Sequence, residues 1–166
     1  MGDLQVQVLM GSGSDADVMA NTVHTLRDLG ISCEMTVASA HRSPERVQRV
    51  IKEALERGVQ VFVVGAGAAA HLAGVVAAHT AVPVIGVPID SSPLGGFDAL
   101  LSTVQMPPGV PVATVAVGKA GAINAAVLAA QILAVGDPAI RARVDAYRQG
   151  LADKVEQAAA ALAERY

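Results

Sequence analysis

Short apolar runs alternate along this chain with segments of helical spacing, and this alternation limits the possible folds more than any other feature. Five runs are predicted to be strands, over residues 4–10, 31–37, 61–64, 83–87 and 112–117. The run at 61–64 reads Val-Phe-Val-Val and has no polar face. Such a strand is typical of the centre of a parallel sheet that helices cover on both sides. The chain is therefore predicted to be an α/β protein with right-handed crossovers between its strands.

The run at 31–37 is different, because polar residues alternate strictly with apolar ones in it. This period of two indicates a half-exposed strand at or near a sheet edge. Beside buried first and third strands, it predicts the strand order 2-1-3-4-5, as in flavodoxin-like folds. We expect one domain over residues 1–166, a three-layer α/β/α sandwich around a central parallel sheet with an added C-terminal helix.

Capping residues and small residues mark the predicted helix ends. Ser14 and Asp17 match a capping box for the first helix, which Gly30 is expected to stop. Ser43 and Pro44 are predicted to cap and start the second helix. A third helix is predicted to end near residue 80, and two more are predicted over 97–105 and 120–135. The last helix is predicted to start at Asp137-Pro138.

Composition and charge argue against several classes of partner. The net charge is −3, and no basic stripe or aromatic platform suggests a nucleic-acid surface. No apolar run reaches the ~20 residues that a membrane helix needs, so no membrane partner is expected. Cys33 is the only cysteine, which excludes an internal disulfide and fits a reducing compartment. The amino terminus lacks the features of a signal peptide, and we therefore expect a cytoplasmic protein.

Three turns of small residues follow predicted strands, over 11–15, 39–42 and 65–71. The carboxyl ends of parallel strands meet at one edge of an open α/β sheet, where such folds bind ligands. The turn at 39–42 reads Ser-Ala-His-Arg, so it puts an imidazole beside a permanent cation. Together the three turns predict a site for a small phosphorylated ligand.

Two of these turns match the dinucleotide fingerprint G-x-G-x-x-A, at 11–16 and 65–70. The fingerprint expects an acidic residue after the second strand, however, and the Ser-Ala-His-Arg turn stands there. Asp15 would also repel a pyrophosphate at the helix amino terminus, whereas its carboxylate is a strong acceptor for ribose hydroxyls. The alternative, in which Ser12, Ser14 and Asp15 only cap a helix, stays open.

The charged and titratable residues of the turns each have two interpretations. Arg42 precedes a helix amino terminus, so its guanidinium, the helix dipole and nearby hydroxyls can act on one phosphate; the alternative is an unpaired surface arginine. His41 is the candidate proton donor and acceptor, with a structural role as its alternative. His71, at the mouth of the third turn, is a second candidate that orients or lines the loop. His24 and His79 fall inside predicted helices and are expected at the surface.

The sequence lacks the motifs that several other kinds of active site require. There is no P-loop lysine, no Cys/His cluster for a metal and no G-x-S-x-G nucleophile turn. A phospho-acceptor receiver domain shares the predicted topology, but it needs an aspartate at the end of the third strand, where Gly65 stands. We therefore expect neither a metal nor a cofactor.

Seven motifs follow one another along the chain. They are Gly11-Ser12-x-Ser14-Asp15, Ser39-Ala40-His41-Arg42, Gly65-Ala66-Gly67-x-Ala69-Ala70-His71-Leu72-x-Gly74, Pro83-Val84-Ile85-Gly86-Val87-Pro88, Leu101-Ser102-x-Val104-Gln105-Met106-Pro107, Pro111-Val112-Ala113-Thr114 and Asn124-Ala125-Ala126. Together they resemble the bacterial N5-carboxyaminoimidazole ribonucleotide mutases of purine synthesis, over about residues 5–135. One departure is Ala73, where the family usually has proline, and the segment after 136 matches poorly.

The resemblance implies a reaction and a set of site residues. The carbamate substrate loses carbon dioxide, which stays trapped beside the imidazole ring and adds at carbon 4, and His41 is the implied general acid/base. The residues implied to bind the ribonucleotide are Ser12, Asp15 and Arg42, with Ser14 and Ser39 in support, and Ala66, Gly67 and Leu72 in the turn that closes around the ring and its carboxylate.

The resemblance also implies a homo-octamer that needs no metal or cofactor. Small apolar residues on outer helices, including 120–135 and 151–163, fit an oligomer, because a monomer would expose them to water. The segment of about 137–166 is expected to be a helical extension used in oligomer packing. Two alternatives remain: a related carboxylase that adds free carbon dioxide to aminoimidazole ribonucleotide, and a non-enzymatic flavodoxin-like module that binds a nucleotide or flavin. The motifs at 101–107 and 111–114 favour the mutase.

Overall fold

The five predicted strands form one parallel sheet in the computed structural model, which describes residues 4–166. The strands are β1 (Val6–Met10), β2 (Cys33–Val37), β3 (Val61–Gly67), β4 (Val84–Ile89) and β5 (Ala113–Thr114). Their order is β2-β1-β3-β4-β5, so the predicted flavodoxin-like topology is confirmed. Val6 of β1 pairs with Cys33 of β2 on one side and with Val61 of β3 on the other, which puts the half-polar strand β2 at the predicted edge.

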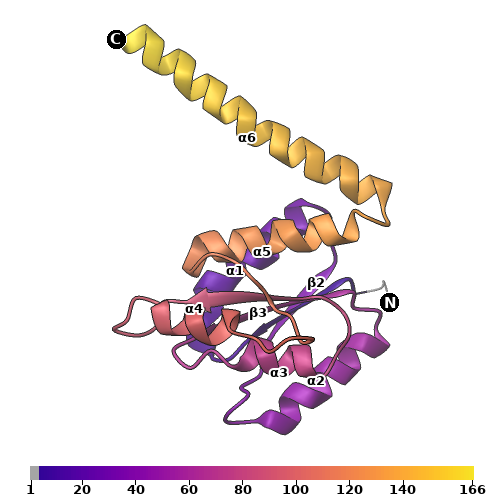
Figure 1. Cartoon of the computed structure of the whole chain (residues 1–166). Helices are drawn as coiled ribbons and strands as arrows, with labels where there is room; N and C mark the ends of the chain where they lie inside the picture. Colours follow the sequence, from indigo (N-terminus) through magenta and orange to yellow (C-terminus); the bar gives the residue numbers. More distant parts are fainter. Residues whose placement is uncertain (1–3) are drawn as a thin grey trace.

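Helices cover both faces of this sheet and make the three predicted layers (Figure 1). They are α1 (Ala16–Asp28), α2 (Pro44–Glu56), α3 (Leu72–Ala78), α4 (Phe97–Val104) and α5 (Gly118–Leu133). One face of the sheet packs against α1 and α5, and the other packs against α2, α3 and α4. Neighbouring side chains of β1 show this division, since Val8 belongs to the first core and Leu9 to the second.

β3 and β5 differ most from their predicted lengths, and the other strands differ by one or two residues. β3 continues past residue 64 to Gly67, because its glycines and alanine still pair with β4, Gly65 with Val87 and Gly67 with Ile89. β5 keeps only residues 113–114 of the predicted 112–117. It lies at the other edge of the sheet and pairs with β4 at two positions, Ala113 with Ile85 and Thr114 with Gly86.

Two predicted helix caps are wrong in detail. The Ser12 hydroxyl, not Ser14, makes the cap: it accepts the backbone N–H of Ser14 at 3.3 Å and starts a short 3-10 turn, η1 (Gly13–Asp15), that leads into α1. Ser43 precedes α2 as predicted, but its hydroxyl donates to the Ser39 carbonyl oxygen at 3.4 Å and does not cap the helix. Both serine hydroxyls therefore shape the turns that follow β1 and β2.

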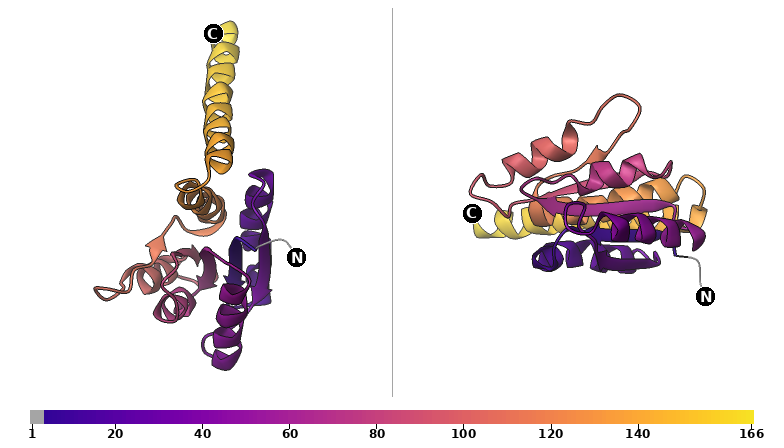
Figure 2. Two further views of the ribbon diagram at one scale, coloured as in Figure 1. Left: turned by 90° about the vertical axis from the view of Figure 1, so that its right-hand side faces the viewer. Right: turned by 90° about the horizontal axis from the view of Figure 1, so that it is seen from below.

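The last helix, α6 (Pro138–Arg165), begins as predicted and leaves the body of the protein (Figure 1, Figure 2). Asp137 caps it, because its carboxylate accepts two backbone N–H groups of the first turn at 2.8 and 3.2 Å. The start of α6 packs on the body through buried Ile140 and Val144, and every side chain from residue 151 onward is exposed. Across residues 4–166, no helix combines the length and the apolar content that crossing a membrane requires.

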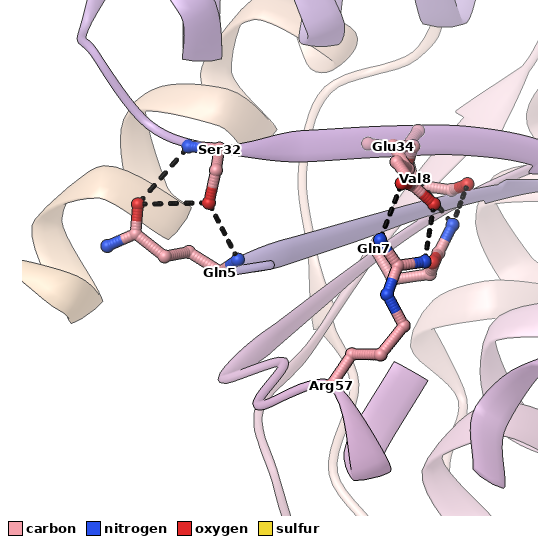
Figure 3. Close-up of polar contacts among 6 residues, drawn as sticks. All are labelled: Gln5, Gln7, Val8, Ser32, Glu34 and Arg57. Carbon is pink, nitrogen blue, oxygen red and sulfur yellow. Dashed lines mark hydrogen bonds and ion pairs between the residues drawn. The ribbon is translucent and has the colours of Figure 1, made fainter. Parts of the chain in front are cut away.

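Polar side chains tie the edge strand β2 to β1 and to the end of α2 (Figure 3). The backbone N–H of Gln5 donates to the Ser32 hydroxyl at 3.0 Å, and the buried Gln7 side chain donates to the Glu34 carbonyl oxygen at 3.1 Å. Arg57, just after α2, donates two hydrogen bonds of 2.6 and 2.7 Å to the Glu34 carboxylate and holds the pKa of that carboxyl below its ordinary value. These contacts hold the amino end of β2 against β1 and the end of α2.

Candidate functional site

The three predicted turns meet at the carboxyl ends of β1, β2 and β3 and line one cavity of about 420 Å³. This is the edge at which open parallel sheets bind ligands. His71 does not line the cavity, but it contacts a residue that does. All the other candidate residues line it: Ser12, Ser14, Asp15, Ser39, His41, Arg42, Ala66, Gly67 and Leu72.

The turn after β1 holds a nearly buried carboxylate, because Asp15 is only 5% exposed. The Ser14 hydroxyl lies 2.9 Å from the Ser12 hydroxyl oxygen and 3.5 Å from Oδ1 of Asp15. Burial raises the pKa of the Asp15 carboxyl, and the Ser14 hydroxyl and the Arg42 charge oppose this only in part. A ligand that donates hydrogen bonds here would add to the few interactions that stabilise the charged carboxylate.

Asp15→Asn is expected to stabilise the ligand-free protein at neutral pH. A carboxyl whose pKa is raised by folding makes the folded state less stable once the pH is high enough to ionise it. The neutral amide avoids this cost, and we expect the melting temperature to rise by roughly 2–4 °C, equivalent to about 1 kcal/mol. Thermal unfolding at several pH values measures the difference, which should shrink in acid because Asp15 is then protonated. A lower melting temperature for Asp15→Asn at neutral pH would contradict this role of the charge.

Arg42 spans the ends of two strands at the cavity wall. Its Nη2 donates to the Gly11 carbonyl oxygen at 3.1 Å, just after β1, and its Nε lies 3.4 Å from the Ser39 hydroxyl, just after β2. The Ser39 hydroxyl also accepts the backbone N–H of Arg42 at 3.2 Å. Within residues 4–166, no carboxylate lies at ion-pair distance from this guanidinium. Its charge is therefore available to an anionic ligand.

His41 and His71 are joined by a direct contact that the sequence did not predict. The two side chains come from the turns after β2 and β3, and His41 Nε2 lies 2.8 Å from His71 Nδ1 with the ring planes 80° apart. A hydrogen bond between two imidazole nitrogens needs one donor and one acceptor, so the pair shares one proton at this contact. His71 thereby fixes the orientation of the His41 ring.

The other two histidines stand away from the cavity. His24 is exposed on α1, as predicted. His79 is also exposed, but it follows the last residue of α3, and its Nδ1 lies 2.8 Å from the Val75 carbonyl oxygen. Among the residues that the structure describes, no group of three or more His, Cys, Asp or Glu side chains is arranged to hold a metal ion.

The third turn is tight, and it brings in a cavity residue that the sequence analysis missed. A Cβ on Gly67 would lie 1.8 Å from the Ser91 hydroxyl oxygen and 3.1 Å from the Ile89 carbonyl oxygen, so a larger residue there would force the Ser91 side chain to move. Ala68 has a φ of +50°, in the left-handed region that favours glycine. Ser91, from the segment after β4, lines the cavity. Its position directly after a strand, in a stretch rich in Pro, Gly and Ser, was the signal that could have identified it.

A doubly wound sheet with an arginine, a nearly buried carboxylate and paired histidines around a cavity at its carboxyl edge defines a flavodoxin-like protein with a candidate ligand site. The model of the AIR carboxylase family matches residues 5–154, and the chain belongs to that family. This match confirms the resemblance predicted from the motifs. It also extends past residue 136, so the poor match predicted for that segment is wrong up to residue 154.

Several known proteins are similar to this chain over most of its length. The N5-carboxyaminoimidazole ribonucleotide mutase of Brucella melitensis is 48% identical over 154 residues, which are 93% of this chain and 95% of that protein. The protein of the same name from Mycobacterium tuberculosis is 51% identical over 151 residues, 91% of this chain and 86% of that protein. A crystal structure of Treponema denticola PurE has a TM-score of 0.83 at 32% identity, covering 92% of this chain and 94% of that one.

Proposed function

We propose that this chain is an N5-carboxyaminoimidazole ribonucleotide mutase, an isomerase that makes 4-carboxy-5-aminoimidazole ribonucleotide in de novo purine synthesis. Relatives of that name support the activity, since they are 48–51% identical over at least 91% of the chain. The observation that carries the proposal is one cavity lined by His41, Arg42 and Asp15. These side chains offer a proton carrier, a cation for a phosphate and an acceptor for hydroxyls. The reaction requires no metal or cofactor.

Each part of the ribonucleotide has a matching group in the cavity or on its wall. The Asp15 carboxylate accepts hydrogen bonds from the ribose hydroxyls, and Arg42 with Ser12 binds the phosphate. The turn after β3 lies against the imidazole ring and its carboxylate, and its apolar residues help to retain carbon dioxide. The supporting residues are Ser14 and Ser39 beside the ribose phosphate, and Ala66, Gly67 and Leu72 in the turn.

His41 carries the proton that the reaction moves. Loss of carbon dioxide breaks the bond between the exocyclic nitrogen and the carboxyl carbon, and the nitrogen keeps the electron pair and takes up one proton. The carbon dioxide then bonds to carbon 4, and the carbon-4 proton leaves to restore the aromatic ring. One proton is taken up and one is released, so a single imidazole that alternates between acid and base suffices. The contact with His71 orients the His41 ring.

We also propose that the chain forms a cytoplasmic homo-octamer in which α6 contributes to the packing. Exposed apolar side chains support self-association: Leu151, Val155 and Leu162 on α6, and Phe97 and Leu101 on α4. Surface of this kind is commonly covered in an assembly. Sedimentation that gave the mass of a single chain would contradict it.

Turnover of the carbamate substrate in bicarbonate-free solution tests the proposed function. A mutase is expected to form the carbon-4 carboxylate at its full rate there, because the carbon dioxide it uses comes from the carbamate itself. A carboxylase would depend on added bicarbonate, and a nucleotide or flavin binder would show no turnover. Either of these two results would overturn the mutase assignment.

A further inference from the structure

A second cavity, of about 460 Å³, adjoins the first at the ends of β1 and β2. Ser12, Ser39 and Arg42 line both cavities, so the two share a wall. Arg46, in the first turn of α2, lines only the second cavity. A ligand that contacts Arg42 can therefore extend into the first cavity, the second cavity or both.

Arg46 is held at the end of β2 by neutral groups. Its Nε donates to the Val37 carbonyl oxygen at 2.7 Å, and its Nη2 donates to the Thr36 hydroxyl at 3.1 Å. In the part of the chain that the structure describes, no carboxylate lies at ion-pair distance from Arg46. The guanidinium is thus partly ordered before a ligand arrives, and its charge has no counter-ion among residues 4–166.

The two cavities differ in charge. The Asp15 carboxylate lines the first cavity, whereas no acidic side chain of residues 4–166 lines the second. The second cavity instead has two guanidinium groups, from Arg42 and Arg46, and serine hydroxyls. A phosphate that carries up to two negative charges is repelled by a carboxylate and attracted by guanidinium groups. The second cavity is therefore the better place for a phosphate.

We propose that Arg46 is a second phosphate-binding residue, and that the 5′-phosphate of the ribonucleotide lies in the second cavity between Arg42 and Arg46. This assignment rests on the proposed function and gives the substrate a direction. The ribose lies beside Ser12, where the two cavities adjoin, and close to Asp15. The imidazole ring lies in the first cavity and points towards His41. Holding the charged end in the second cavity thus presents the reacting ring to the proton carrier.

Calorimetric titrations of the full chain with aminoimidazole ribonucleotide, its riboside and ribose 5-phosphate test the assignment. Arg46→Gln is expected to weaken both phosphorylated ligands by roughly 10-fold or more and to leave riboside affinity within about 2-fold, since one charged hydrogen-bonded contact is lost. Arg46→Lys keeps the charge and should recover part of the affinity. Inorganic phosphate should compete with the ribonucleotide, because both need the second cavity.

Arg49→Gln is the matched control, because it removes the same charge from an exposed position on α2 that lines neither cavity. It should bind all three ligands like the wild type. Wild-type affinity of Arg46→Gln for the ribonucleotide would overturn the assignment, and so would inorganic phosphate that fails to compete. An equal loss for the riboside would also overturn it, since Arg46 would then act only through its contacts with β2. Binding of ribose 5-phosphate can be measured without turnover, so the two proposals can fail separately. If the protein were inactive but still bound ribose 5-phosphate through Arg46, the mutase assignment would be wrong and the phosphate site would stand.

Discussion

His41→Asn is expected to abolish interconversion of the two carboxylated ribonucleotides, with kcat lowered by roughly 10³-fold or more. Asparagine can still form hydrogen bonds at this position, but its amide cannot take up and release a proton near neutral pH. Ribonucleotide binding should survive, because Arg42 and Asp15 are the groups proposed to hold the phosphate and the ribose. Steady-state turnover of the carbamate, together with calorimetric binding of the ribonucleotide, separates the two effects.

His24→Asn provides the matched control for this experiment. It removes another exposed imidazole, from α1, that does not line the cavity. The control variant should keep full activity. A loss of activity in His41→Asn alone would then be due to the loss of proton transfer at this position, and not to the removal of any exposed histidine. Near-normal turnover in His41→Asn would remove the role assigned to this side chain.

The cavity could be predicted from the sequence because its position depends on the backbone alone. The ends of β1, β2 and β3 must share one edge of a parallel sheet, so the turns that carry Asp15, Arg42 and Gly67 had to meet there. The contact between His41 and His71 could not be predicted in the same way. It joins residues 30 positions apart and depends on the direction of two side chains, which strand order does not determine.

The errors in the prediction also have physical causes. Ser12, Ser14 and Ser43 all lie near helix starts, and a serine hydroxyl can bond to any of several nearby backbone groups, so its partner depends on the turn that forms. β5 is short because only two of its residues pair with β4, and which residues pair is a property of the assembled sheet. Ser91 was missed because the sequence marked its segment only as a loop, although that loop also leaves a strand at the carboxyl edge.

Gly121→Ala is expected to destabilise the fold by about 3 kcal/mol or more and to lower the melting temperature by roughly 6–12 °C. A Cβ on Gly121 would lie 1.6 Å from the carbonyl oxygen of Ala116 and 2.6 Å from its carbonyl carbon. Both are backbone atoms that cannot rotate away, so the start of α5 would have to move. Gly118, with a φ of +70°, turns the chain into α5 between these two residues, and that turn would be disturbed as well.

The displacement of α5 is expected to reach the cavity through α1. The two helices are joined by a buried hydrogen bond in which the Thr22 hydroxyl donates to the Ala122 carbonyl oxygen at 2.8 Å, and α1 starts directly after Asp15. Ribonucleotide binding should therefore weaken along with stability. Gly136→Ala is the control, because no atom lies within 4 Å of the position of its Cβ, and its melting temperature should stay within about 2 °C of the wild type. Equal melting temperatures for the two variants would show that the backbone at Ala116 yields without cost, and the start of α5 would then not depend on glycine.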